Sequence, residues 1–134
     1  NILASYAYID ARITKTASNS EKDFDMQRPS TPRHSGNIWT KYIITEGPLK
    51  HLGLGAGYNF VTERFGQVGR RANTTVYPGY GLVNAVLYYK INQIQLQANL
   101  NNILNKTHWV GGYDKLRSFP GAPRNINVTV SYKF

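Results

Sequence analysis

Residues 126–134 alternate without a break between apolar and polar side chains, which predicts a β-strand with two chemically different faces. Successive side chains of a strand point to opposite sides. One face would carry Ile126, Val128, Val130, Tyr132 and Phe134. The other would carry Asn127, Thr129, Ser131 and Lys133. The segment ends on an aromatic residue, Phe134, which is typical of the closing strand of an outer-membrane β-barrel.

Five further segments have the same two-residue period, namely residues 2–14, 36–44, 52–62, 80–89 and 93–101. In 93–101 one face holds five amide side chains, which would be costly in a dry core but suit water or a polar partner. In 52–62 one face holds Gly53, Gly55 and Gly57. Glycine inside a strand often marks the close approach of another backbone, so we expect another domain to pack there. The direction of Trp39 is left open.

The connections between these strands alternate in length. Long polar loops follow the first, third and fifth strands, over residues 15–28, 63–73 and 102–123, whereas residues 45–48 and 90–92 form short turns. Transmembrane β-barrels have this asymmetry, and their strands need about 9–11 residues. Six strands are too few for a single-chain barrel. We therefore expect an all-β, antiparallel transmembrane β-barrel, of which this chain, starting in mid-pattern, is a piece.

Composition leaves one hypothesis from a different class open. The 134 residues have a net charge of +9, ten tyrosines, two tryptophans and five phenylalanines, which would suit a soluble basic β-protein that binds nucleic acid. That hypothesis does not explain why the long loops all lie at one end. The chain has no cysteine, and its mean hydropathy of −0.43 argues against a helical membrane protein.

Several segments, in order and over nearly the whole chain, resemble the C-terminal end of a TonB-dependent outer-membrane receptor of the ferric-siderophore type. They are SYAYIDA at 5–11, TPRHS at 31–35, WTKY at 39–42, LGLGAGY at 52–58, YPGY at 77–80, LNNILNK at 100–106 and PGAPRN at 120–125. The last two are similar to the family's N-N-L-F-D-K and G-x-P-R segments. Ile103, Leu104 and Asn105 depart from the more usual Leu-Phe-Asp.

The resemblance implies a 22-stranded barrel of the Gram-negative outer membrane, filled by an N-terminal plug. Residues 1–134 would supply its last six strands, without the plug. It further implies import of a ferric siderophore, energised by TonB acting on the plug, with no resident cofactor and no nucleic-acid partner. A receptor for haem or cobalamin and a passive porin stay open as alternatives within the same architecture.

The residues predict binding rather than catalysis. His34, His51 and His108 fit no zinc motif, and we expect them to be structural or exposed. The loop 102–123 combines aromatic area with positive charge, which suits a bulky anionic iron chelate. The candidate ligand contacts are Trp109, Tyr113, Arg117, Phe119 and Tyr77, with Lys115 beside them.

Two further expectations concern the surfaces of the wall. Basic loop residues would meet lipopolysaccharide phosphates or attract the chelate; they are Arg28, Arg33, Arg64, Arg70, Arg71, Lys106, Lys115, Arg117 and Arg124. The phase of the alternation predicts lipid contact for Leu54, Ala56, Leu87, Leu96, Val128 and Val130. It puts a polar set on the inward face, where the resemblance implies contact with the plug: Gln93, Gln95, Gln97, Asn99, Asn101, Asn127 and Thr129.

Overall fold

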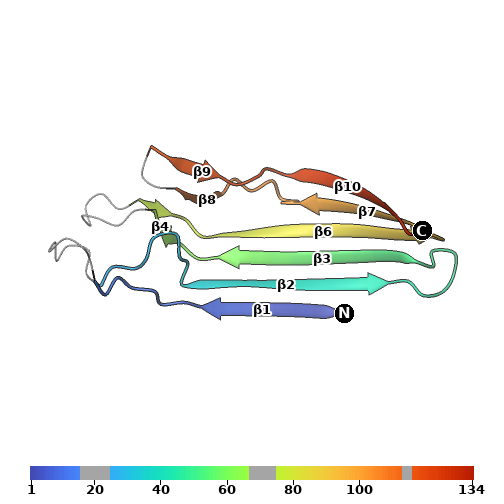
Figure 1. Ribbon diagram of the computed structural model, residues 1–134, viewed down its shortest axis with the longest axis horizontal. Coiled ribbons are helices and arrows are strands. Elements are labelled where there is room, and N and C mark those ends of the chain that lie inside the picture. Colours follow the sequence, from blue (N-terminus) through green and yellow to red (C-terminus); the bar gives the residue numbers. More distant parts are fainter. Residues whose placement is uncertain (16–24, 67–74, 113–115) are drawn as a thin grey trace.

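One antiparallel sheet of six strands, in the order β1-β2-β3-β6-β7-β10, forms the body of the computed structural model (Figure 1). Residues 1–15, 25–66, 75–112 and 116–134 are described. The strands are β1 (Ile2–Tyr8), β2 (His34–Ile43), β3 (Leu52–Val61), β6 (Tyr80–Ile91), β7 (Ile94–Asn101) and β10 (Asn125–Tyr132). Each pairs with its neighbours in sequence, so the sheet is an up-and-down meander. Within the described ranges no helix is long and apolar enough to span a membrane.

All six predicted strands are present, and their boundaries differ from prediction by at most two residues, except at the end of β1. Strand β1 ends at Tyr8 rather than at Thr14, and the chain beyond it continues through irregular pairs, such as the Ile13 N–H donating to the Met26 carbonyl at 3.0 Å. Strand β6 extends to Ile91, which shortens the following turn to two residues. Asn92 makes this tight turn possible by taking a φ of 51°, a region that asparagine tolerates.

Two of the predicted loops contain small hairpins. One pairs β4 (Arg64–Phe65) with β5 (Val76–Tyr77), and the other pairs β8 (Trp109–Gly112) with β9 (Ser118–Pro120). Both lie at the end of the sheet opposite the chain termini and the short turns (Figure 1). These pieces of two to four residues are too short to show a period, which is why the sequence predicts loops there.

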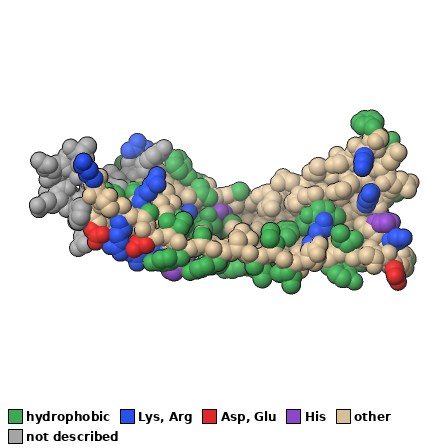
Figure 2. Space-filling view, turned by 60° about the horizontal axis from the view of Figure 1, so that its bottom comes forward, with side chains coloured by type: hydrophobic (Ala, Val, Ile, Leu, Met, Phe, Trp, Pro, Cys, Tyr) green, Lys and Arg blue, Asp and Glu red, His purple; other side chains and the backbone are tan. Residues whose placement is uncertain are grey.

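The strand register confirms that the six residues predicted to meet lipid share one face. Leu54 pairs with Leu87, which pairs with Ala98, which pairs with Val128. Ala56, Leu96 and Val130 fall in the same phase. Figure 2 shows apolar side chains gathered along the middle of the sheet and charged ones at its two ends. This surface, the apolar face, is the one that a barrel would turn toward lipid.

In β1 the apolar face carries Ile2, Ala4, Tyr6 and Tyr8, whereas Leu3, Ser5 and Ala7 lie on the polar face. Tyr6 pairs with Gly36 and Tyr8 with His34, whereas Leu3 pairs with Trp39. The sequence of this strand alone cannot decide between its two faces, because both contain apolar or aromatic side chains. The register of β1 against β2 decides which residues of β1 lie on each face.

The opposite surface, the polar face, carries amides that bond to one another. The Asn84 amide donates to Asn59 Oδ1 at 2.9 Å, and the Asn101 amide donates to Asn125 Oδ1 at 2.9 Å. Of the residues predicted to meet a plug, those within β7 and β10 share this face. Gln93 does not lie within a strand: in the turn, its Oε1 accepts a hydrogen bond of 2.6 Å from the Tyr132 hydroxyl.

Trp39 lies on the polar face and covers the glycines of β3. A Cβ atom built on Gly57 would lie 1.7 Å from Trp39 Cε3, and one on Gly55 would lie 2.7 Å from Val86 Cγ1. The space at Gly57, which we expected another domain to fill, is therefore occupied by an indole ring from the neighbouring strand. Glycine is required there because the ring and the β3 backbone are in direct contact.

Candidate ligand-binding site

Arg64 joins the two small hairpins at the long-loop end. Its side chain is buried, with 5% exposed, and its guanidinium donates to the Val110 carbonyl at 3.2 Å and to the Trp109 carbonyl. The same group lies 5.3 Å from the centre of the Tyr80 ring, within the range of a cation–π contact. Strand β8, which carries the candidate contact Trp109, is thus held in place by a buried charge from β4.

His108 packs beneath this arrangement. Its ring centre lies 4.5 Å from that of Tyr80, and its Nδ1 lies 3.1 Å from the Lys106 carbonyl. A Cβ on Gly121 would lie 1.9 Å from His108 Nε2, so only glycine leaves room for the ring. The burial of His108 supports the structural role expected from its sequence context. In the described part of the chain, no three potential ligands come together to hold a metal.

Asn102 has a structural role in the segment LNNILNK, which is similar to N-N-L-F-D-K. It is 3% exposed and has a φ of 50°. Its amide donates to the carbonyls of Lys106 and Ala122 at 3.0 and 3.1 Å, and its Oδ1 accepts from the Lys106 N–H at 2.8 Å. One asparagine therefore ties the end of β7 to the segment that leads into β10.

Tyr77 is buried, with 2% exposed, and its hydroxyl lies 3.1 Å from Ser118 Oγ. A Cβ on Gly66 or on Gly112 would lie 2.5 or 2.0 Å from Tyr77 atoms. The ring thus packs between the two small hairpins, as Arg64 does. This position supports a packing role, and a ligand contact by Tyr77 stays a prediction.

Three other candidates lie on or beside the β8–β9 hairpin. Trp109 is 38% exposed and Phe119 is 48% exposed, and Arg117 is also exposed. Phe119 pairs with Gly111, two residues after Trp109, so one hairpin presents both rings. Tyr113 and Lys115 lie outside the described residues.

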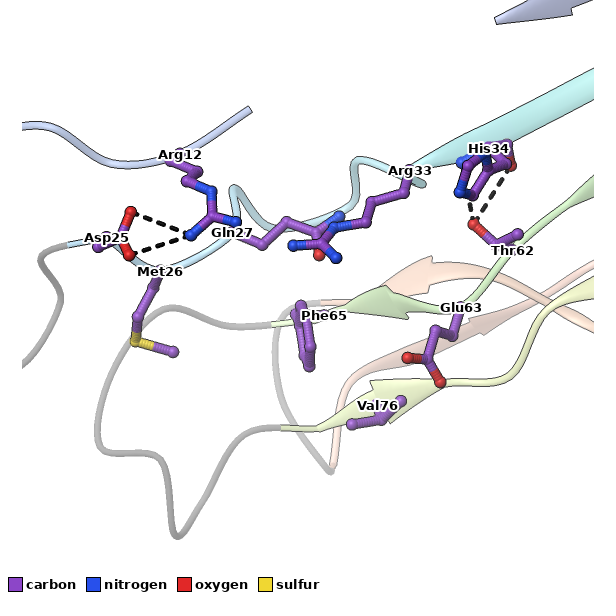
Figure 3. Close-up of a pocket in the computed structure, with 10 residues that line it drawn as sticks. All are labelled: Arg12, Asp25, Met26, Gln27, Arg33, His34, Thr62, Glu63, Phe65 and Val76. Carbon is purple, nitrogen blue, oxygen red and sulfur yellow. Dashed lines mark hydrogen bonds and ion pairs between the residues drawn. The ribbon is translucent and has the colours of Figure 1, made fainter. Parts of the chain in front are cut away.

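A hollow of about 790 Å³ opens between the first long loop and the β4–β5 hairpin (Figure 3). It is lined by Arg12, Asp25, Met26, Gln27, Arg33, His34, Thr62, Glu63, Phe65 and Val76. Its volume lies in the range of small-molecule sites. The sequence alone does not predict this hollow, because the loop and the hairpin that form it are distant in sequence; of its lining residues, only Arg33 and His34 are candidates from the sequence.

Ion pairs organise one end of this hollow. The Arg12 guanidinium lies 3.0 Å from an Asp25 oxygen and 3.1 Å from an Asp10 oxygen, and Arg33 lies 3.7 Å from Asp10. The hydrogen bond to Asp10, and then that to Asp25, raises the pKa of Arg12 above its ordinary value. At the other end the Thr62 hydroxyl contacts the His34 backbone (Figure 3). Much of the positive charge here is already balanced by carboxylates.

An up-and-down sheet with one apolar face, one amide-rich face and all its long loops at one end is a section of the wall of a β-barrel receptor. A family model described as "TonB dependent receptor-like, beta-barrel" matches residues 1–103, and the chain belongs to this family. Family membership sets aside the hypothesis of a soluble protein that binds nucleic acid.

Named relatives match this chain along nearly all of its length. It is 31% identical to the ferrioxamine B receptor of Salmonella typhimurium, over 98% of the chain and 18% of that receptor. It is 29% identical to the metal-pseudopaline receptor CntO of Pseudomonas aeruginosa, over 99% of the chain and 18% of that receptor. The chain thus spans about 18% of the length of these relatives.

Solved structures match in the same way. The crystal structure of the siderophore receptor PiuA from Acinetobacter baumannii is similar with a TM-score of 0.78 and 29% identity, over 100% of this chain and 19% of that one. The ferric-catecholate import receptor Fiu from Escherichia coli has the same fold in this region, with a TM-score of 0.79, 23% identity and coverage of 99% and 18%.

Proposed function

We propose that the receptor containing this segment is an outer-membrane transporter that binds a ferric siderophore outside the cell and moves it inward with energy from TonB. The observation that carries this proposal is that the relatives matched across 98–100% of the chain include receptors named for siderophores. In this proposal the apolar face meets lipid, the polar face surrounds a plug, and TonB acts through that plug. No bond is made or broken in the ligand.

The proposed ligand contacts are Trp109, Arg117 and Phe119 on the β8–β9 hairpin, together with Tyr113 in the same loop. Aromatic rings offer large, rigid contact area, and a positive field attracts an anionic chelate. Tyr77 and Arg64 would then act from below by holding the hairpin in place. Exposed basic side chains such as Lys106 and Arg124 would meet lipopolysaccharide phosphates.

The test is binding and uptake by the complete receptor in cells that lack other siderophore receptors. A variant with Trp109→Ala and Phe119→Ala should bind a ferric hydroxamate or catecholate about tenfold or more weakly, because losing one key aromatic contact often costs more than about 1 kcal/mol. Val110→Ala is the matched control, since Val110 is exposed on the same strand. Folded receptor should be equally abundant in all variants.

Two outcomes would count against the proposal at different levels. Unchanged chelate affinity in the double variant would remove the β8–β9 hairpin from the ligand site. No uptake of iron with any siderophore would refute the transport function itself.

A second candidate is uptake of a chelate of another metal. It is favoured by the 29% identity to a relative named a metal-pseudopaline receptor. Uptake measured with iron, zinc and nickel chelates in parallel would separate the two candidates, because a ferric siderophore receptor should transport only the iron complex.

A further inference from the structure

The polar face has a hollow of about 250 Å³ at the short-turn end of the sheet. Besides Ile43 and Gly53, it is lined by Lys41 of β2, Tyr88 and Lys90 of β6, Gln95 of β7 and His51 of the turn before β3. The register places the strand residues on one face, since Lys90 pairs with Gln95 and Tyr88 pairs with Gly53. We call this set the basic hollow.

Positive charge gathers at the basic hollow, and none of the described residues that line it or the adjoining hollow is a carboxylate. Lys41 Nζ lies 4.1 Å from the centre of the Tyr88 ring, so this ammonium is held over the polar face. Lys50 lines an adjoining hollow together with His51 and Lys90. The ion pairs in which both residues are described join Arg12 or Arg33 to aspartates at the other end of the sheet. Glu46, in the same turn region, is exposed and outside these pairs.

The position of the basic hollow restricts what can balance this charge. Lys41, Lys90 and Gln95 lie on the face opposite Leu54 and Leu87, and therefore away from the face that meets lipid. The hollow is also at the opposite end of the sheet from the β8–β9 hairpin (Figure 1). Lipid phosphates and a chelate bound at the long loops are thus both poorly placed to fill it.

We propose that the basic hollow binds carboxylate side chains of an acidic segment of the receptor's own plug. This inference rests on the proposed function, which puts a plug inside the wall. Ammonium groups pair with carboxylates through charge-assisted hydrogen bonds, and the Gln95 amide and the Tyr88 hydroxyl supply further donors beside them. These ion pairs would hold the plug in one position against the polar face, at the short-turn end of the sheet.

Cross-linking of the complete, detergent-purified receptor tests this contact directly. A water-soluble carbodiimide joins an amine to a carboxylate only where the two touch, and mass spectrometry identifies both peptides. Lys41 and Lys90 should each give a cross-link to an acidic plug peptide. Lys106, exposed at the opposite end, is the control and should give none. In parallel, acetylation of Lys41 and Lys90 by an activated acetate ester should be slower than that of Lys106.

Substitutions separate charge from shape. The variant with Lys41→Gln and Lys90→Gln should release its plug at a lower urea concentration than the wild-type receptor. The variant with Lys41→Arg and Lys90→Arg keeps the charge and should behave as wild type. A merely structural role for the two side chains would make both variants equally weak.

Each contrary result overturns the inference. Acetylation of Lys41 and Lys90 as fast as that of Lys106, without a cross-link, would show an empty hollow. Slow acetylation without a cross-link would show an occupant without carboxylates, such as a lipid phosphate. A cross-link to a different protein would show another partner. None of these results affects iron uptake, so failure of this inference and failure of the proposed function are distinguishable.

Discussion

Adding a single methyl group at Gly57 should destabilise the folded barrel, because there is no space for it. Its Cβ would lie 1.7 Å from Trp39 Cε3 and 2.2 Å from Trp39 Cζ3, distances that no real contact allows. The indole is rigid, so either the ring leaves the polar face or β2 and β3 separate. Gly53 provides a matched control on the same strand and face, because its Cβ would meet nothing closer than 3.4 Å.

Two effects of opposite sign set the magnitude. Replacing glycine by alanine at a compatible position stabilises by about 0.4–1 kcal/mol through the unfolded state. Overpacking costs about 1–3 kcal/mol. Gly53→Ala should therefore be neutral or slightly stabilising, whereas Gly57→Ala should lower the free energy of unfolding by about 1–2 kcal/mol. With Trp39→Ala present the clash is gone, so the two substitutions should couple by about 0.5–3 kcal/mol.

The assay is urea-dependent unfolding of the complete receptor in lipid vesicles, followed by the heat-dependent gel mobility of the folded barrel. Five receptors are needed: wild type, Gly53→Ala, Gly57→Ala, Trp39→Ala and the double variant Gly57→Ala with Trp39→Ala. Equal stability of Gly53→Ala and Gly57→Ala would refute the reasoning, because it would mean that the indole does not lie on Gly57.

Three further predictions follow from the two faces and the loop contacts. Leu87→Arg, on the apolar face, should cost about 2–4 kcal/mol in the same urea assay if it lies near the membrane centre, whereas Gln97→Arg on the polar face of the next strand should be tolerated. Arg64→Met should leave the carbonyls of Trp109 and Val110 without their donor, at about 1–3 kcal/mol, and speed amide hydrogen exchange in β8 while β6 is unaffected. Asn102→Ala should be more destabilising than Asn102→Gly in that urea assay, because both lose the side-chain hydrogen bonds but only alanine is strained at a φ of 50°.

The sequence determined the strands and their faces wherever the alternation is long and chemically clear. Residues 93–101 and 126–134 show this best, since polar side chains separate from aliphatic and aromatic ones with the two-residue period that strand geometry imposes. The lengths of the connections between these strands also predicted that the long loops lie at one end of the sheet. The LNNILNK segment pointed to the family, although its letters did not reveal that Asn102 would close the loop.

Pairing between strands decided the rest, because a strand's own residues do not say what lies beside it. Leu3 and Tyr6 are equally plausible on either face of β1 until their partners on β2 are known. Trp39 covers Gly57 only because the register of β2 against β3 makes them neighbours. Arg64 reaches the Trp109 carbonyl in β8 from 45 residues away. Lys41 of β2 lies over the Tyr88 ring of β6, although β3 lies between these two strands. Such contacts are set by the register and curvature of the sheet, which no local pattern of residues contains.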